Sequence, residues 1–96
     1  MTVRLISPAE DELAEAVKFY EARRSGLGLD FLDAFESAVS RVRSRPEAWS
    51  MFIPGFRRCL LLRFPYSLVY AVRETEIILV AVMHLHKMPG YWTGRL

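Results

Sequence analysis

The chain has 96 residues, 52% of them hydrophobic, so we expect one domain, residues 1–96, with a packed core rather than a disordered segment. Its single cysteine, the absence of a secretory signal and the lack of a bilayer-length apolar run predict a cytoplasmic protein without membrane association. The net charge is only +2, but residues 46–96 hold six basic and three acidic side chains, which is compatible with an anionic partner.

The first half of the chain predicts a short strand and two helices. Thr2 to Ile6 alternate polar and apolar residues, as in a strand. Ser7, Pro8 and Glu10 then match a helix start with a capping box, and this helix should run to about Arg24. Its apolar residues recur at spacings of three and four: Leu13, Ala16, Val17 and Tyr20. The second helix should begin near Gly28 to Asp30 and stop at Pro46, so the short spacer predicts an antiparallel helical hairpin.

The second half predicts a loop and three strands. The loop covers residues 47–55, and the strands cover about Phe56 to Leu62, Tyr66 to Arg73, and Glu76 to about His84. Short connections favour an antiparallel meander, with the helices on one of its faces. We therefore expect an α+β fold of order β-α-α-β-β-β, in which a two-helix hairpin packs on a small antiparallel sheet.

The last strand is apolar on both of its predicted faces. Strict alternation places Ile77, Leu79, Ala81 and Met83 on one face and Ile78, Val80 and Val82 on the other. One helical layer covers only one face, so something else should cover the second. The candidates are the loop with Trp49, the tail with Tyr91 and Trp92, or another chain. Cover from within the chain is favoured, and a partner in addition stays open.

Several polar residues of the second half could carry chemistry. Cleavage of RNA requires a base, an acid and cations for the phosphorane, and His84, Lys87 and Tyr91 are suitable types. Each also has a structural interpretation: His84 as a strand end, Tyr91 and Trp92 as packing residues. Alternation puts Arg58 opposite Arg57 and Arg63, so Arg58 is either a phosphate ligand or a charge that keeps a sheet edge soluble. His84 and His86 lack a further metal ligand nearby, so we expect no metal and no cofactor.

The chain resembles the RelE/ParE superfamily of bacterial toxins, and within it the ParE-like, plasmid-stabilisation branch. The resemblance is carried by SPAEDELAEAVKFYE, GLGLDFLDAFESAVSRV, RPE, RRCLLLRFPYSLVYAV and AVMHLHKMPGYWTGR, in this order over nearly the whole chain. It implies the fold expected above. It also implies a toxin that is neutralised by a cognate antitoxin in a hetero-oligomer, with an antitoxin segment wrapped around the toxin.

The resemblance leaves the target open between two classes. RelE-type members cut messenger RNA in the ribosome and usually carry an arginine at the position of Ser67. ParE-type members lack the cleavage set and bind DNA gyrase, so Ser67 favours growth inhibition through gyrase. A ribosome-dependent endoribonuclease is the alternative, and a non-toxic protein-binding domain is the second alternative. The catalytic set of a nuclease would be Arg58, His84, Lys87 and Tyr91; the residues that bind target or antitoxin would be Arg58, Arg63, Lys87, Tyr91, Trp92 and Arg95.

Overall fold

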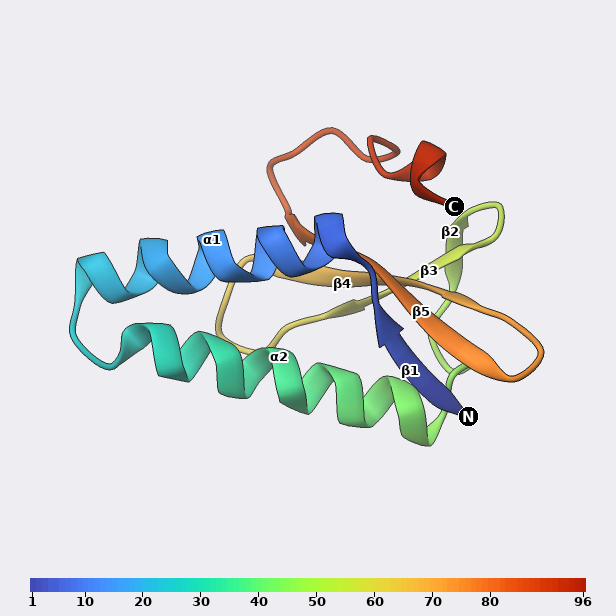
Figure 1. The fold of residues 1–96 in the computed structure, drawn as a ribbon, viewed down its shortest axis with the longest axis horizontal. Helices are drawn as coiled ribbons and strands as arrows, with labels where there is room; N and C mark the ends of the chain where they lie inside the picture. The colour runs from blue at the N-terminus through green and yellow to red at the C-terminus, as the bar shows by residue number, and fades with distance from the viewer.

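The computed structural model describes residues 1–96, which form two helices and one five-stranded sheet (Figure 1). The elements are β1 (Thr2–Leu5), α1 (Ser7–Arg23), α2 (Leu27–Ser44), β2 (Met51–Ile53), β3 (Phe56–Leu60), β4 (Tyr66–Val72), β5 (Glu76–His84) and the 3-10 turn η1 (Thr93–Arg95). The strand order is β1-β5-β4-β3-β2. This is the predicted β-α-α-β-β-β order with one additional short strand, β2. None of the helices is both long enough and apolar enough to cross a membrane.

The helical hairpin depends on two glycines at its turn. Gly26 has φ 90°, a left-handed conformation that suits glycine, and its N–H donates to the Glu21 carboxylate. Gly28 lies so close to α1 that an added Cβ would be 2.8 Å from the Val17 carbonyl oxygen. The predicted capping box is wrong, because the N-cap is Ile6, whose N–H is already bonded to the Leu79 carbonyl of β5. Because the pairing of β1 with β5 holds Ile6 in place, the helix begins at Ser7, one residue earlier than a helix capped by Ser7 would begin.

The sheet is mixed rather than purely antiparallel. β3, β4 and β5 form the predicted antiparallel meander, and β1 adds to β5 in parallel. A β-bulge changes the predicted faces of β5: Val69 pairs with Ala81 and Tyr70 with Leu79, so Val80 is the extra residue. The prediction that residues alternate strictly between the two faces of β5 is therefore wrong beyond Leu79.

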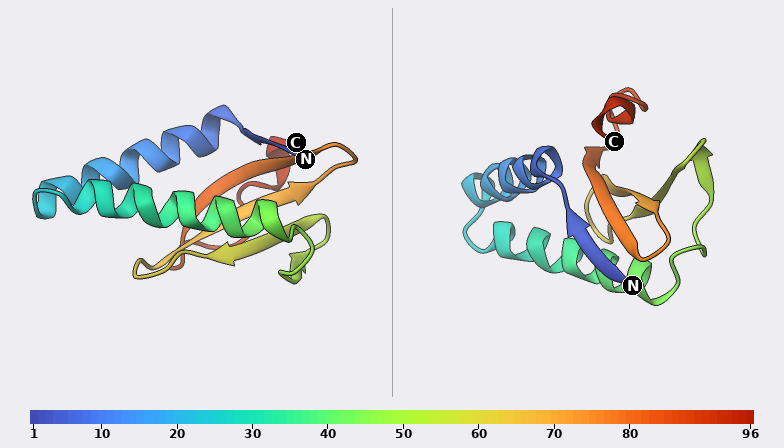
Figure 2. Two further views of the ribbon diagram at one scale, coloured as in Figure 1. Left: turned by 90° about the horizontal axis from the view of Figure 1, so that it is seen from below. Right: turned by 45° about the vertical axis from the view of Figure 1, so that its right-hand side comes forward.

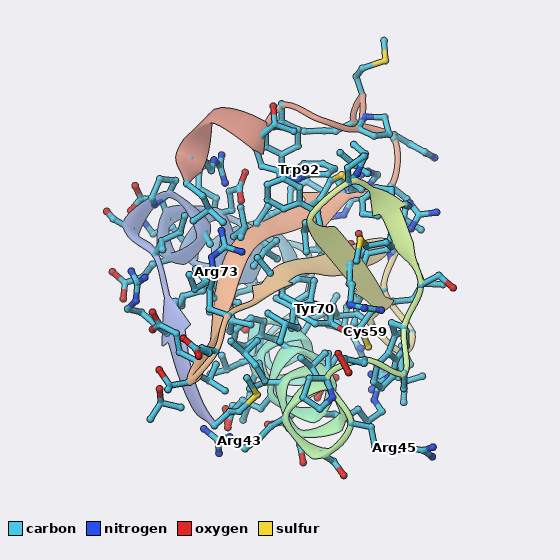
Figure 3. All side chains as sticks on the ribbon, turned by 90° about the vertical axis from the view of Figure 1, so that its right-hand side faces the viewer. Arg43, Arg45, Cys59, Tyr70, Arg73 and Trp92 are labelled. Atoms are coloured by element: carbon cyan, nitrogen blue, oxygen red, sulfur yellow. The ribbon has the colours of Figure 1, made fainter.

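The two faces of the sheet carry two separate cores. The helical hairpin covers the first, where Leu68, Tyr70, Ile77, Leu79 and Val82 are buried (Figure 2). The C-terminal tail and β2 cover the second, which is built from Val69, Ala71, Ile78, Val80, Ala81 and Met83 under Trp92 and Phe52. Figure 3 shows Trp92 between the tail and the sheet, and Tyr70 on the side of α2. Cover from within the chain is thus confirmed, but Trp49 packs on the helical side instead.

Candidate functional site

The C-terminal tail, residues 85–96, returns along the second face of the sheet after β5 ends at His84 (Figure 1). Its first residue is tied down, because the Leu85 N–H donates to the Pro65 carbonyl oxygen at 2.9 Å. Its last turn is η1, where the Arg95 N–H donates to the Trp92 carbonyl oxygen at 2.9 Å. Trp92 is fully buried against the rings of Phe52 and Phe56, at 5.5 and 6.2 Å between centroids. The tail is therefore a packed part of the fold.

The carboxylate of Glu12, on α1, joins the tail to the sheet. It accepts two hydrogen bonds from the Arg95 guanidinium at 3.0 Å each and one from the Tyr91 hydroxyl at 2.8 Å. It also accepts the backbone N–H of Val82 at 3.0 Å, and Arg95 donates further to the Val80 carbonyl oxygen at 2.9 Å. We call Glu12, Tyr91 and Arg95, with these two backbone groups of β5, the tail latch. The latch connects the first helix, the last strand and the end of the chain.

The latch also sets the protonation of its members. Burial, together with the hydrogen bond to Glu12, raises the pKa of Tyr91 well above that of a free phenol. The hydrogen bond to Glu12 likewise raises the pKa of Arg95, although burial opposes it. Tyr91 is a neutral donor at physiological pH, and both side chains are engaged with the Glu12 carboxylate.

A groove lies beside the latch, between α1 and the end of β5. Its volume is about 390 Å³, and its lining residues include Asp11, Glu15, Phe19, Tyr66, His84 and Lys87. The His84 Nδ1 accepts the backbone N–H of His86 at 3.0 Å, and its ring meets the edge of Tyr66 at 5.0 Å. The Lys87 ammonium lies 5.2 Å from the Tyr91 ring centre. The structure thus brings His84, Lys87 and Tyr91 together.

Arg58 and Arg63, two further residues of the predicted binding set, lie elsewhere. Arg58 stacks on Phe52, 4.5 Å from its ring centre, two strands away from β5. Arg63 has φ 73° and lies 3.6 Å from the carboxylate of Asp30, at the start of α2. Arg58, Arg63 and Lys87 therefore do not form one cationic surface. Backbone geometry explains this, because the loop after β3 carries Arg63 toward the helical hairpin.

A second candidate surface is the outer edge of β3. The short β2 pairs only with Phe56 and Arg57, so β3 has no partner strand from Arg58 onward. Leu60 and Leu62 are 52% and 58% exposed there. Together with Arg41, Trp49, Ser50, Phe52 and Arg58 they line a hollow of about 380 Å³, which we call the β3-edge hollow. An open strand edge with exposed leucines and two arginines is a typical place for an extended peptide to pair.

The remaining candidate positions are structural. Cys59 is fully buried, and burial raises the pKa of its thiol, so it is no nucleophile in the folded chain. Arg57 donates to the Trp49 carbonyl oxygen at 2.6 Å, which fixes the segment before β2. His84 and His86 have no third ligand, as the structure contains no group of three His, Cys, Asp or Glu side chains that could hold a metal.

Glu12 is the residue that sequence analysis missed. In sequence it is one of several acidic residues near the start of α1, where a carboxylate complements the helix dipole without any specific partner. The available signal was its spacing: Glu12 follows the buried Ala9 by three residues and precedes the buried Ala16 by four. A carboxylate on the buried stripe of a helix requires a partner.

Comparison with known proteins identifies the family. The family model for the ParE toxin of the type II toxin–antitoxin system parDE matches residues 3–89. A solved structure of the chromosomal ParDE system from P. aeruginosa is 20% identical, covers 90% of this chain and 97% of its own, and superposes with a TM-score of 0.68. At that identity it supports the fold alone. The comparison with curated proteins finds no match. Since the family model spans most of the sequence, this chain belongs to the ParE toxins of type II toxin–antitoxin systems.

Proposed function

We propose that this chain arrests bacterial growth by binding DNA gyrase, without cutting nucleic acid, and that a cognate antitoxin neutralises it. Membership of the ParE family supports the toxin role. The observation that carries the choice of binding over cleavage is the tail latch. It occupies Tyr91 and Arg95 with Glu12, and both would otherwise be the most suitable groups for acid catalysis and phosphate binding.

Two further positions support binding over cleavage. Ser67 stands where an RNA-cleaving relative would carry arginine; it is fully buried, so no cation is presented there. Arg58 is stacked on Phe52, whereas His84 and Lys87 lie in the groove beside α1. Cleavage requires a base, an acid and a cation at one phosphodiester. The candidate cation Arg58 lies on a different part of the surface from the acid and base candidates His84 and Lys87.

For the antitoxin we propose an extended segment that adds to the open edge of β3. The related P. aeruginosa structure is of a ParDE toxin–antitoxin system, which supports a protein partner of this kind. Strand addition would pair with the outer edge of β3 from Arg58 onward, where the Leu60 carbonyl oxygen already accepts from Arg41 at 3.3 Å, and would bury Leu60 and Leu62. Apolar residues in alternate positions of the partner fit the leucines, and an acidic residue fits Arg58 and Arg41, which line the same hollow.

The partner surface is tested with matched leucine variants. Leu60→Glu and Leu62→Glu should each weaken antitoxin affinity by about tenfold, since a half-exposed leucine contributes roughly 1–1.5 kcal/mol on burial. Leu29→Glu is the control, because Leu29 is 62% exposed on α2, outside the hollow. Arg58→Ala should slow association and flatten its salt dependence. Equal affinities for all three leucine variants would refute this docking site.

The target is tested by inducing the chain alone in a bacterial host. We expect growth arrest, rescue by co-expressed antitoxin, and relaxed plasmid DNA on a topology gel. Transcript ends should not change within translated messages. Codon-positioned cuts that disappear in His84→Ala would instead support the nuclease, and normal growth at confirmed expression would support a non-toxic binding domain.

A further inference from the structure

The outer edge of β5 is only partly covered by a strand. β1 pairs with Glu76 to Leu79 and then leaves the sheet to begin α1, whereas β5 continues to His84. Beyond Leu79 the edge would present unpaired backbone groups. Side chains take the place of a strand here: Glu12 accepts the Val82 N–H, and Arg95 donates to the Val80 carbonyl oxygen. One ion pair thus satisfies a donor and an acceptor of an interrupted sheet edge.

This ion pair is poorly hydrated. The side chains of Arg95 and Glu12 are 20% and 19% exposed, whereas the other ion pairs of the chain have at least one partner more than half exposed. A charge in such a place is costly once its partner is removed. Glu12 has four donors around it, so its loss would leave Arg95, Tyr91 and the Val82 N–H without their acceptor.

One exposed loop, residues 85–90, is held at both ends, and the latch holds its second end. The loop begins at Leu85, bonded to the Pro65 carbonyl oxygen, and ends next to Tyr91, bonded to Glu12. Between these points Met88 is 82% exposed and Leu85 is 40% exposed, with Lys87 beside them. Apolar and cationic side chains concentrated on a short anchored loop are typical of a binding element.

We propose that Glu12 is a positioning residue: its carboxylate holds the tail so that the loop of residues 85–90 is presented to the toxin's target in one fixed conformation. The role of the loop rests on the proposed function, whereas the latch itself stands on the hydrogen bonds given above. Glu12 touches no target in this scheme. It acts through Arg95 and Tyr91. Without Glu12 the loop would be mobile, and ordering the loop on binding would lower the affinity for the target.

The tail can be followed directly through Trp92. The chain has two tryptophans, so a Trp49→Phe background leaves Trp92, the fully buried residue of the tail, as the only indole. In this background we compare Glu12→Ala, Glu12→Gln and Arg95→Ala. Glu10→Ala is the matched control, because Glu10 is exposed on the same helix, lies outside the groove, and its side chain makes no hydrogen bond or ion pair. Arg95→Ala leaves α1 intact, so it tests the latch even where Glu12→Ala lowers the stability of the helix.

We expect the population with a released tail to rise about tenfold or more in Glu12→Ala and Arg95→Ala, since hydrogen bonds to charged groups are lost. Trp92 emission should shift to the red and acrylamide quenching should increase, while far-UV circular dichroism is retained. Growth inhibition should fall most in the variants in which the tail is released most. Glu12→Gln keeps an acceptor oxygen for Val82 and should be intermediate; Glu10→Ala should match the parent.

Each contrary result has its own meaning. If Trp92 in Glu12→Ala and Arg95→Ala is as well shielded from acrylamide as in the parent, the latch is overturned. A released tail with undiminished growth inhibition overturns the positioning role. If the parent chain itself does not arrest growth, the proposed function fails and the positioning role fails with it, whereas the fluorescence comparison still decides whether Glu12 holds the tail.

Discussion

Replacing Trp92 with alanine should destabilise the chain more than any other single change in the tail. Trp92 is fully buried, and its ring lies 5.5 Å from Phe52 and 6.2 Å from Phe56 between centroids. Truncation of a buried tryptophan costs about 3–5 kcal/mol. A domain of this size has a free energy of unfolding of about 5–15 kcal/mol, so about a fifth of it or more would be lost.

Trp92→Phe separates packing from hydrogen bonding at the same position. The indole Nε1 of Trp92 is buried without a hydrogen-bond partner, so phenylalanine removes an unsatisfied donor while it retains much of the apolar contact. We expect this variant to lose only about 0–2 kcal/mol. Urea denaturation followed by far-UV circular dichroism measures both variants against the parent. A loss below 1 kcal/mol in Trp92→Ala would show that the tail does not cover the second face.

Three other predictions concern residues away from the tail. Burial raises the pKa of Tyr70 to about 12, so its contribution to stability is present below pH 10 and is lost as pH rises toward 12; Tyr70→Phe should flatten the decline of the unfolding free energy across this window. Gly28→Ala should cost about 1–3 kcal/mol, because the new Cβ would meet the Val17 carbonyl oxygen at 2.8 Å. Gly94→Ala, whose Cβ would enter open space, is its control, and equal melting temperatures for the two would contradict the close helix contact. Cys59 should react with a thiol reagent only after unfolding, and rapid labelling of the native chain would contradict its burial.

The helices and the three long strands were predictable because their signals are local. Apolar spacing along α1 and α2, and compact apolar runs in β4 and β5, identify these elements within a few residues. β2 was missed because it has only three residues and exists through pairing with Phe56 and Arg57. The bulge at Val80 was also missed: its neighbours Leu79 and Ala81 are apolar as well, so residue types do not reveal which faces they take.

The candidate site was predictable only in part. The sequence places Lys87, Tyr91, Trp92 and Arg95 close together, and they do lie close together. It does not reveal that Arg95 and Tyr91 face Glu12, since these partners are separated by 83 and 79 positions. Such a pairing depends on where β1 stops and α1 begins, which is a property of the folded chain. The position of Arg63 also depends on the folded chain, because the positive φ at this residue directs its side chain to Asp30.

Supercoiling by purified DNA gyrase, titrated with the purified chain, tests the proposed target most directly. We predict that the chain stops supercoiling or traps cleaved DNA, that antitoxin added beforehand prevents this, and that the same preparation leaves ribosome-bound message intact. Undiminished supercoiling at an excess of a preparation that arrests growth when produced in cells would contradict gyrase as the target.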